Sequence, residues 1–327
     1  MPLTVDLDSS ATKLGDMERY FAENVWNSTD QLVCHSRDMC RTSAMKRPDT
    51  SFHEGQGQMV GPYFDLAVDE KPLRVLVIPM EFGSDESGIS FTDRTSNVAD
   101  MASQKQFQQL NPHMRGVVFT LQLAYGLPAG ESGANVLNIE GHGEVHLFKA
   151  YAMVNLLWCS AVRGTTMSSR STGLMRASCS RHMRATIDIL KPTLVISQGS
   201  GLDETLRASL GVREPVNPHI AECELDGNKF VWASLRHPTL HWHSTKYPYF
   251  RDVVAPTIGE ARDRALAVDE RVGHEAGGDG VEVAAPRERH AALLRVAGHD
   301  AAAVDDDLAD AAQDLQQVGH GALGAVL

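Results

Sequence analysis

Four cysteines are the residues of this 327-residue chain whose type and spacing most clearly favour chemistry. Cys34 and Cys40 lie near the N-terminus with five residues between them, whereas Cys159 and Cys179 lie in the middle of the chain. Four thiolates are the usual ligands of a [4Fe-4S] cluster, and they suit a tetrahedral zinc ion equally. The pattern predicts a metal centre that joins an N-terminal segment to the core. The alternative is four unrelated buried thiols, and Cys223 is interpreted as a non-ligand.

Alternating strands and helices would have to position these side chains. The apolar run RVLVI, residues 74–78, is typical of a strand that is buried on both faces, and three similar runs follow it. Strands that alternate with helices favour an α/β fold, here a three-layer α/β/α sandwich around a central, mostly parallel four-stranded sheet. Residues 27–62 are predicted to be loops. The predicted strands are 74–78, 148–157, 193–198 and 229–235, and the predicted helices 14–26, 96–110, 113–125, 173–190, 202–210 and 246–258.

Composition limits the classes of protein that fit. The formal net charge of −12 argues against binding nucleic acid by bulk attraction, although scattered arginines could still contact a phosphate backbone. We find no apolar stretch of membrane-spanning length and no signal-peptide pattern near the N-terminus, so we expect no membrane association and a cytoplasmic location. Cysteines in that compartment are reduced or bind metal. We also expect a monomer.

The chain divides by composition into three parts. Residues 1–29 are predicted to form a helical N-terminal extension, 30–258 an α/β domain, and 259–327 an Ala-rich acidic tail. From Gly259 onward the chain uses only the ten residue types whose codons begin with G or C. The tail is therefore interpreted as a run-on in a shifted frame. The alternative is a genuine tail that is disordered or loosely helical.

Short motifs at the four predicted strand ends occur in a recognisable order. Ligands of parallel α/β sheets bind beyond the carboxyl ends of the strands, so these positions matter most. The ordered set resembles the uracil-DNA glycosylase superfamily, in particular its iron–sulfur branch of families 4 and 5, over about residues 30–258. The motifs are GQGQ (55–58), IPMEFG (78–83), Asn155 with Cys159 four residues on, Cys179 followed by Leu190-Lys191-Pro192, and HPT (237–239).

The chain departs from the pattern of that branch at two places. Cys34 and Cys40 have five intervening residues where the branch commonly has two. The first strand-end motif lacks its usual Gly and Pro, because Pro79 and Phe82 occupy those positions when Gly83 is aligned. The resemblance implies a structural role for the cluster, which would hold the N-terminal loops that approach DNA.

The resemblance also implies roles in base excision, in which the enzyme flips a base out of the stack and breaks its N-glycosidic bond. Phe91 would stack on the base beside Gly83, and Asn155 would hydrogen-bond its edge. Glu81 would orient and deprotonate water, and His237 would stabilise the departing base. The structural alternatives are core packing for Phe91, a strand-end cap for Asn155, an exposed carboxylate for Glu81 and a satisfied loop histidine for His237.

Three further residues are predicted to contact DNA. Leu240 or Trp242 would wedge into the gap that the flipped base leaves, and Ser200 would contact a phosphate from the start of a helix. Together these expectations predict a monofunctional DNA glycosylase that hydrolyses uracil or a related deaminated base from DNA, with no metal in catalysis. The alternative is a protein on the same fold that binds uracil or DNA without hydrolysis, or that is trapped covalently on DNA.

Overall fold

The computed structural model describes residues 2–27, 29–83, 85–104, 112–129, 135–164, 168–199, 202–238 and 249–268. The chain divides into two units, Met1–Ala276 and Gly277–Leu327, and everything below belongs to the first. None of the described helices combines the length and apolar composition needed to cross a bilayer.

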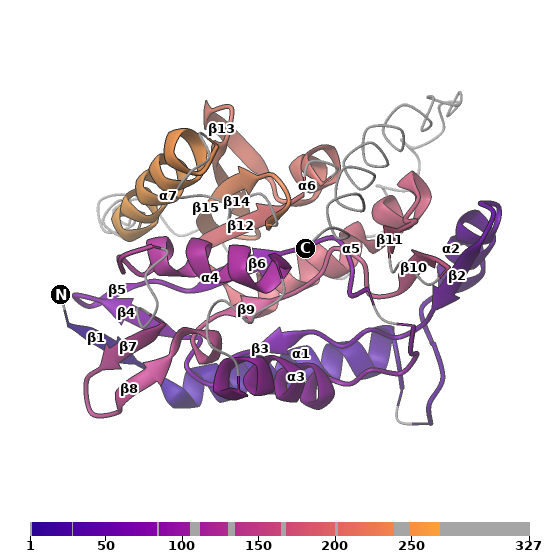
Figure 1. Cartoon of the computed structure of the whole chain (residues 1–327), viewed down its shortest axis with the longest axis horizontal. Coiled ribbons are helices and arrows are strands. Elements are labelled where there is room, and N and C mark those ends of the chain that lie inside the picture. Colours follow the sequence, from indigo (N-terminus) through magenta and orange to yellow (C-terminus); the bar gives the residue numbers. More distant parts are fainter. Residues whose placement is uncertain are drawn as a thin grey trace, which may run out of the picture. The chain divides into compact units, whose positions relative to one another are not determined.

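A seven-stranded mixed sheet forms the centre of this unit, in the order β13-β14-β15-β12-β6-β9-β3 (Figure 1). Its four central strands β15, β12, β6 and β9 run parallel, and the strands at both edges run antiparallel to their neighbours. The α/β class is confirmed, but the sheet is larger and more mixed than the four-stranded one predicted. The strands are β3 (Met59–Val60), β6 (Val75–Ile78), β9 (Ala152–Met153), β12 (Leu194–Gln198), β13 (Val212–Asn217), β14 (Ile220–Leu225) and β15 (Asn228–Leu235).

Helices cover both faces of this sheet, as the alternation of side chains along β6 shows. Val75 and Val77 pack in a core with α4 and α7, whereas Leu76 and Ile78 pack in a second core with α1, α5 and α6. Both sets are fully buried, which explains why the strand reads as a continuous apolar run. The helices are α1 (Leu7–Asn24), α4 (Pro112–Ala124), α5 (Gly173–Leu190), α6 (Asp203–Ser209) and α7 (Ala255–Ala267).

One predicted strand is much shorter in the structure. Within residues 148–157 only Ala152 and Met153 form strand β9, and the 3-10 turn Leu147–Lys149 precedes it. The apolar run there reports burial, and burial alone does not separate a strand from a buried turn. Ladder bonds nevertheless continue beyond β9, because the N–H of Val154 donates to Val77 O and that of Leu156 to Pro79 O.

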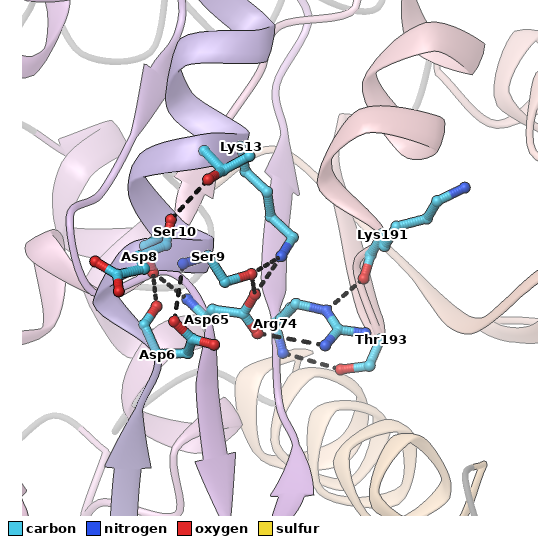
Figure 2. Close-up of polar contacts among 10 residues, drawn as sticks. Asp6, Asp8, Ser9, Ser10, Lys13, Asp65, Arg74, Lys191 and Thr193 are labelled. Carbon is cyan, nitrogen blue, oxygen red and sulfur yellow. Dashed lines mark hydrogen bonds and ion pairs between the residues drawn. The ribbon is translucent and has the colours of Figure 1, made fainter.

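The N-terminal residues are an integral part of the fold and not an extension. Strand β1 (Leu3–Val5) lies inside a five-stranded sheet, and α1 places Met17 and Phe21 in the second core. Figure 2 shows how α1 is attached: Asp65 accepts hydrogen bonds from Ser9 Oγ at 2.6 Å and from Lys13 Nζ. The other strands of this sheet are β4 (Leu66–Val68), β5 (Lys71–Pro72), β7 (Val136–Ile139) and β8 (Gly143–His146).

The same carboxylate connects α1 to the central sheet. Arg74, which directly precedes β6, donates to Asp65 Oδ1 at 3.3 Å and to the backbone oxygen of Lys191 at 2.5 Å (Figure 2). Lys191 ends α5 in the left-handed conformation, with φ of 46°. The partly buried pair of Asp65 and Arg74 therefore holds together the start of α1, the start of β6 and the end of α5.

Residues 27–62 contain more secondary structure than the loops predicted there. They include helix α2 (Arg37–Met45) and strand β2 (Thr50–His53), which pairs with β10 (Ser160–Arg163) in a three-stranded sheet completed by β11 (Ser168–Ser169). Helix α2 is largely polar, so it lacks a wide apolar face and its helical period is hard to see in the sequence. Helix α3 spans Phe91–Gln104.

The last described helix crosses the predicted boundary at residue 258. A π-helical turn, Phe250–Val254, leads directly into α7, which continues to Ala267. Ala261 and Ala265 are buried in the first core. The folded part of the chain therefore extends beyond the start of the predicted tail, while residues 269–327 lie outside those that the structure describes.

Candidate functional site

The four cysteines singled out in the sequence line one small, largely enclosed cavity. Cys40 comes from α2 and Cys179 from α5, while Cys34 and Cys159 precede α2 and β10, respectively. All four are free thiols. The fold thus brings together two pairs that are more than a hundred residues apart in sequence.

A buried carboxylate holds α2, and with it Cys40, against the rest of the molecule. Glu54 follows strand β2 and accepts a hydrogen bond from Arg37 Nε at 3.1 Å and another from Arg41 NH2 at 2.5 Å. Both arginines belong to α2, one turn apart, so the two bonds fix the rotation of the helix. The side of α2 that carries Cys40 therefore faces the cavity.

Burial makes these thiols hard to ionise in the absence of a cation. Desolvation raises the pKa of Cys40 and Cys159, and it raises the pKa of Cys179 to about 12. Cys34 is half-buried, and Arg181 NH2 lies 3.4 Å and His182 Nε2 3.8 Å from its sulfur. Thiolates rather than thiols bind metals, so a bound cation would be needed to hold this set deprotonated.

The cavity offers sulfur as its main donor, which fits an iron–sulfur cluster. Within the described part of the chain, no three His, Cys, Asp or Glu side chains form a group able to hold a single metal ion. Cys223 does not line the cavity; it is buried on β14 and packs in the second core, in line with the non-ligand interpretation.

Asn155 lies just beyond β9 with its side-chain amide buried and without a partner. Its backbone N–H donates to Gln58 Oε1 at 2.6 Å, and Gln58 in turn donates to Gln56 O at 2.7 Å. Among the residues that the structure describes, neither Asn155 Oδ1 nor Nδ2 has a hydrogen-bond partner, although the residue is only 1 % exposed. Buried amides are nearly always paired, so this one is available to a ligand or a water.

His237 follows β15 at the same edge of the sheet as Asn155. Its ring centroid lies 5.5 Å from that of His113 on α4. The side chain is exposed, but desolvation by neighbouring atoms lowers its pKa from the ordinary value of a histidine, which favours the neutral imidazole. The next residue, Pro238, contacts the α4 backbone so closely that a Cβ on Gly116 would lie 2.0 Å from Pro238 O.

Glu81 faces a different set of elements. Its Oε2 accepts the backbone N–H of Ala161 on β10 at 2.7 Å, with Ser169 and Arg176 close by. Desolvation is the main reason that its pKa is raised to about 7. The Glu81 carboxylate thus contacts β10, β11 and the start of α5, whereas His237 contacts α4. The contacts of Glu81 and of His237 therefore involve different elements, and they do not bring the two predicted catalytic side chains together.

The remaining predicted residues have mixed outcomes. Phe91 is 3 % exposed and packs edge-on against Phe21, with ring centroids 5.5 Å apart, as the core-packing alternative expects. Its stacking role stays a prediction, because a buried aromatic ring can pack on one side and stack on a ligand on the other. Gly83 is exposed. Ser200, Leu240 and Trp242 lie outside the described residues.

Two further polar residues, to which the sequence analysis assigns no role, lie near the ends of these strands. Gln198 is the last residue of β12, and its Oε1 is buried without a partner. Arg94 on α3 is 7 % exposed, and its guanidinium carbon lies 3.6 Å from the ring centroid of Phe82. The strand-end rule already includes Gln198, but no sequence signal separates Arg94 from a surface arginine.

The chain matches no known protein-family model, and a search of curated proteins finds no similar sequence.

Proposed function

We propose that this protein is a DNA glycosylase that removes uracil or a related deaminated base. The observation that carries the proposal is the amide of Asn155, which is buried, unpartnered and fixed at the carboxyl end of a parallel strand. An amide presents one donor and one acceptor, which is what the edge of a pyrimidine-2,4-dione requires. Such strand ends are where α/β sheets bind ligands.

In this proposal the neutral imidazole of His237 stabilises the base as it departs. The bond between C1′ and the base nitrogen breaks, its electron pair leaves with the base, and water adds to C1′ while losing a proton to solvent. A preorganised donor close to the developing anion lowers the barrier to this step. The low pKa of His237 suits it, since a neutral imidazole still donates one N–H.

Cys34, Cys40, Cys159 and Cys179 would hold a [4Fe-4S] cluster in the cavity that they line. Bound there, the cluster supplies structural cross-linking and no step of the hydrolysis. It would join α2 to α5 and to the segment that leads from Asn155 into β10. Four thiolates also suit zinc, which is the chemical alternative, although no three donors among the described residues are grouped closely enough to hold a single ion.

A second candidate function, binding without hydrolysis, is favoured by the position of Glu81. Its carboxylate already accepts the N–H of Ala161, so it is engaged in holding β10. A protein that keeps the Asn155 amide but has no carboxylate free to act as general base would bind a nucleobase without cleaving its N-glycosidic bond. The two functions differ in whether the free base is released from DNA.

The test is release of uracil from an oligonucleotide that contains one uracil, followed by alkaline cleavage of the abasic site. We expect cleavage by the wild type and a loss of at least 100-fold in Asn155→Ala, because a buried group that is left unpaired discriminates strongly. Asn24→Ala, a change on α1, is the control. Tight binding of the oligonucleotide without cleavage, as single or double strand, would establish the second function instead.

A further inference from the structure

Two amide side chains, Gln198 and Asn155, stand on either side of Pro79 at one edge of the central sheet. Ile78 is in register with Ser197 on β12, and Val77 with Met153 on β9. The hydrogen bonds from Val154 N to Val77 O and from Leu156 N to Pro79 O continue the pairing beyond β9. With both registers extended along the strands in this way, Gln198, Pro79 and Asn155 lie in one row across the sheet. Strands are spaced about 4.8 Å apart, so the two amides project from backbones about 10 Å apart.

Both amides project from the same face of the sheet. Side chains alternate along a strand, and Ile196, Val77 and Met153, each two residues earlier, all belong to the first core. The residue between the amides is a proline, whose short ring carries no polar side-chain atom that could pair with either amide. Gln198 and Asn155 are each 1 % exposed, so both amides are shielded from bulk water.

The orientation of the Gln198 amide is fixed from behind by α4. The Thr120 hydroxyl donates to Gly116 O at 2.9 Å, which leaves its oxygen to accept from Gln198 Nε2 at 3.1 Å. Because the amide nitrogen is engaged in this way, Gln198 presents its Oε1 as the remaining group. That oxygen is buried and has no hydrogen-bond partner. A buried acceptor in this position requires an N–H or O–H donor from something else.

We propose that Gln198 is a specificity-determining residue that accepts a hydrogen bond from a ring N–H of the ligand, opposite Asn155. This inference rests on the proposed function and specifies its substrate. If the amides are as far apart as their backbones, two hydrogen bonds of about 2.9 Å leave about 4 Å between the two ligand atoms that they reach, which suits one six-membered ring rather than a fused pair. The ligand class is therefore a single-ring cyclic imide, such as a pyrimidine-2,4-dione, and not a 6-oxopurine.

Binding of the free bases tests the inference without requiring catalysis. Titration calorimetry on the full-length, metal-loaded protein should show saturable binding of uracil, and hypoxanthine should bind at least 10-fold more weakly. Gln198→Leu removes the acceptor at nearly constant volume and should weaken uracil binding about 10- to 100-fold. Gln31→Leu, at an exposed glutamine, should leave binding unchanged.

Thr120 provides a second variant pair that does not alter the amide itself. Thr120→Val removes the acceptor that orients Gln198 and should weaken uracil binding, whereas Thr120→Ser keeps the hydroxyl and should restore it. A merely structural role of Thr120 would not show this rescue at equal unfolding free energy. The pair also keeps the inference testable if Gln198→Leu fails to fold.

The inference would be overturned by equal binding of uracil by wild type and Gln198→Leu, by equal binding of hypoxanthine and uracil, or by no uracil binding up to about 10 mM. The first would show that an ordered water, and not a ligand, completes the amide pair. Uracil release from DNA that is unaffected by Gln198→Leu would refute the inference and leave the proposed function standing. Uracil binding that depends on Gln198, with no release of uracil from DNA, would support the inference and refute the proposed function.

Discussion

Replacing Glu81 with glutamine should stabilise the protein, and by an amount that grows with pH. Burial raises the pKa of the Glu81 carboxyl from 4.5 to about 7, so the folded state disfavours the ionised form. The stability that the protonated form contributes is complete below pH 4.5 and is lost as the pH rises through 7. The gap corresponds to about 3.4 kcal/mol at most, at 1.36 kcal/mol for each pH unit.

The Glu81→Gln variant would keep most of the native contacts without this cost. Its new amide oxygen can accept the Ala161 N–H that Glu81 Oε2 accepts now, and its amide nitrogen would occupy the place of Oε1, which is buried without a partner. We therefore expect the stability of Glu81→Gln relative to wild type to rise by about 2.5 kcal/mol between pH 5 and pH 8. Urea denaturation at several pH values measures this difference.

Asp85→Asn, at an exposed carboxylate in the same segment, is the matched control. A constant difference between Glu81→Gln and wild type from pH 5 to pH 8 would refute the reasoning, because it would mean that Glu81 is not desolvated. The same variant also tests the chemistry. If it releases uracil at the wild-type rate, Glu81 holds β10 in place and is not the general base that the sequence suggested.

Two further predictions concern the cysteine cavity and the Asp65 contacts. Cys179→Ser should purify with at least a several-fold loss of bound iron and acid-labile sulfide, whereas Cys223→Ser should retain both; equal metal content in the two would contradict the proposed ligand set. Asp65→Asn should lower the unfolding free energy by about 3 kcal/mol at pH 7, because it leaves the partly buried Lys13 and Arg74 without their carboxylate, whereas Asp16→Asn, in an exposed pair with Arg19, should cost less than about 1 kcal/mol. Burial alone would raise the pKa of Asp65, but hydrogen bonds from Lys13 and Ser9 and the charge of Arg74 hold it below 3.8. The difference in unfolding free energy between wild type and Asp65→Asn should therefore shrink as the pH falls through that pKa. An equal difference at pH 3 and pH 7 would contradict this prediction.

The sequence predicted the elements whose apolar patterns are strong. Helix α5 was predicted at 173–190 and has those bounds, because Thr172 caps its start and Pro192 follows its end. Strands β6, β12 and β15 were placed within one residue at each end, since buried parallel strands form short, continuous apolar runs. Strand β14 is not predicted, because Glu222 and Glu224 interrupt its apolar residues and leave no continuous apolar run.

The site could be predicted only in part, because side-chain direction depends on tertiary contacts. That four distant cysteines line one cavity followed from their place between recognisable elements. The orientation of Glu81 toward Ala161 did not, since a loop residue can face either side of a sheet. The contact of Phe91 with Phe21 likewise depends on the N-terminal helix, which lies seventy residues away in the sequence. The importance of Gln198 depends on Thr120, which no local pattern connects to it.

The close contact between Gly116 and Pro238 gives helix α4 a second role as a spacer. His113, Gly116 and Thr120 are spaced three and four residues apart, so they lie on one side of the helix. Through them α4 contacts the segment after β15 at one point and the end of β12 at another, about 6 Å further along its axis. Because the backbones of Gly116 and Pro238 touch directly, no side chain between them could repack to compensate for a shift of the helix. A single residue inserted between Gly116 and Thr120 would rotate one contact by about 100° relative to the other. The distance between His237 and Gln198 is therefore set by the length of this helical segment, and sequence change there would alter the site more than most substitutions within it.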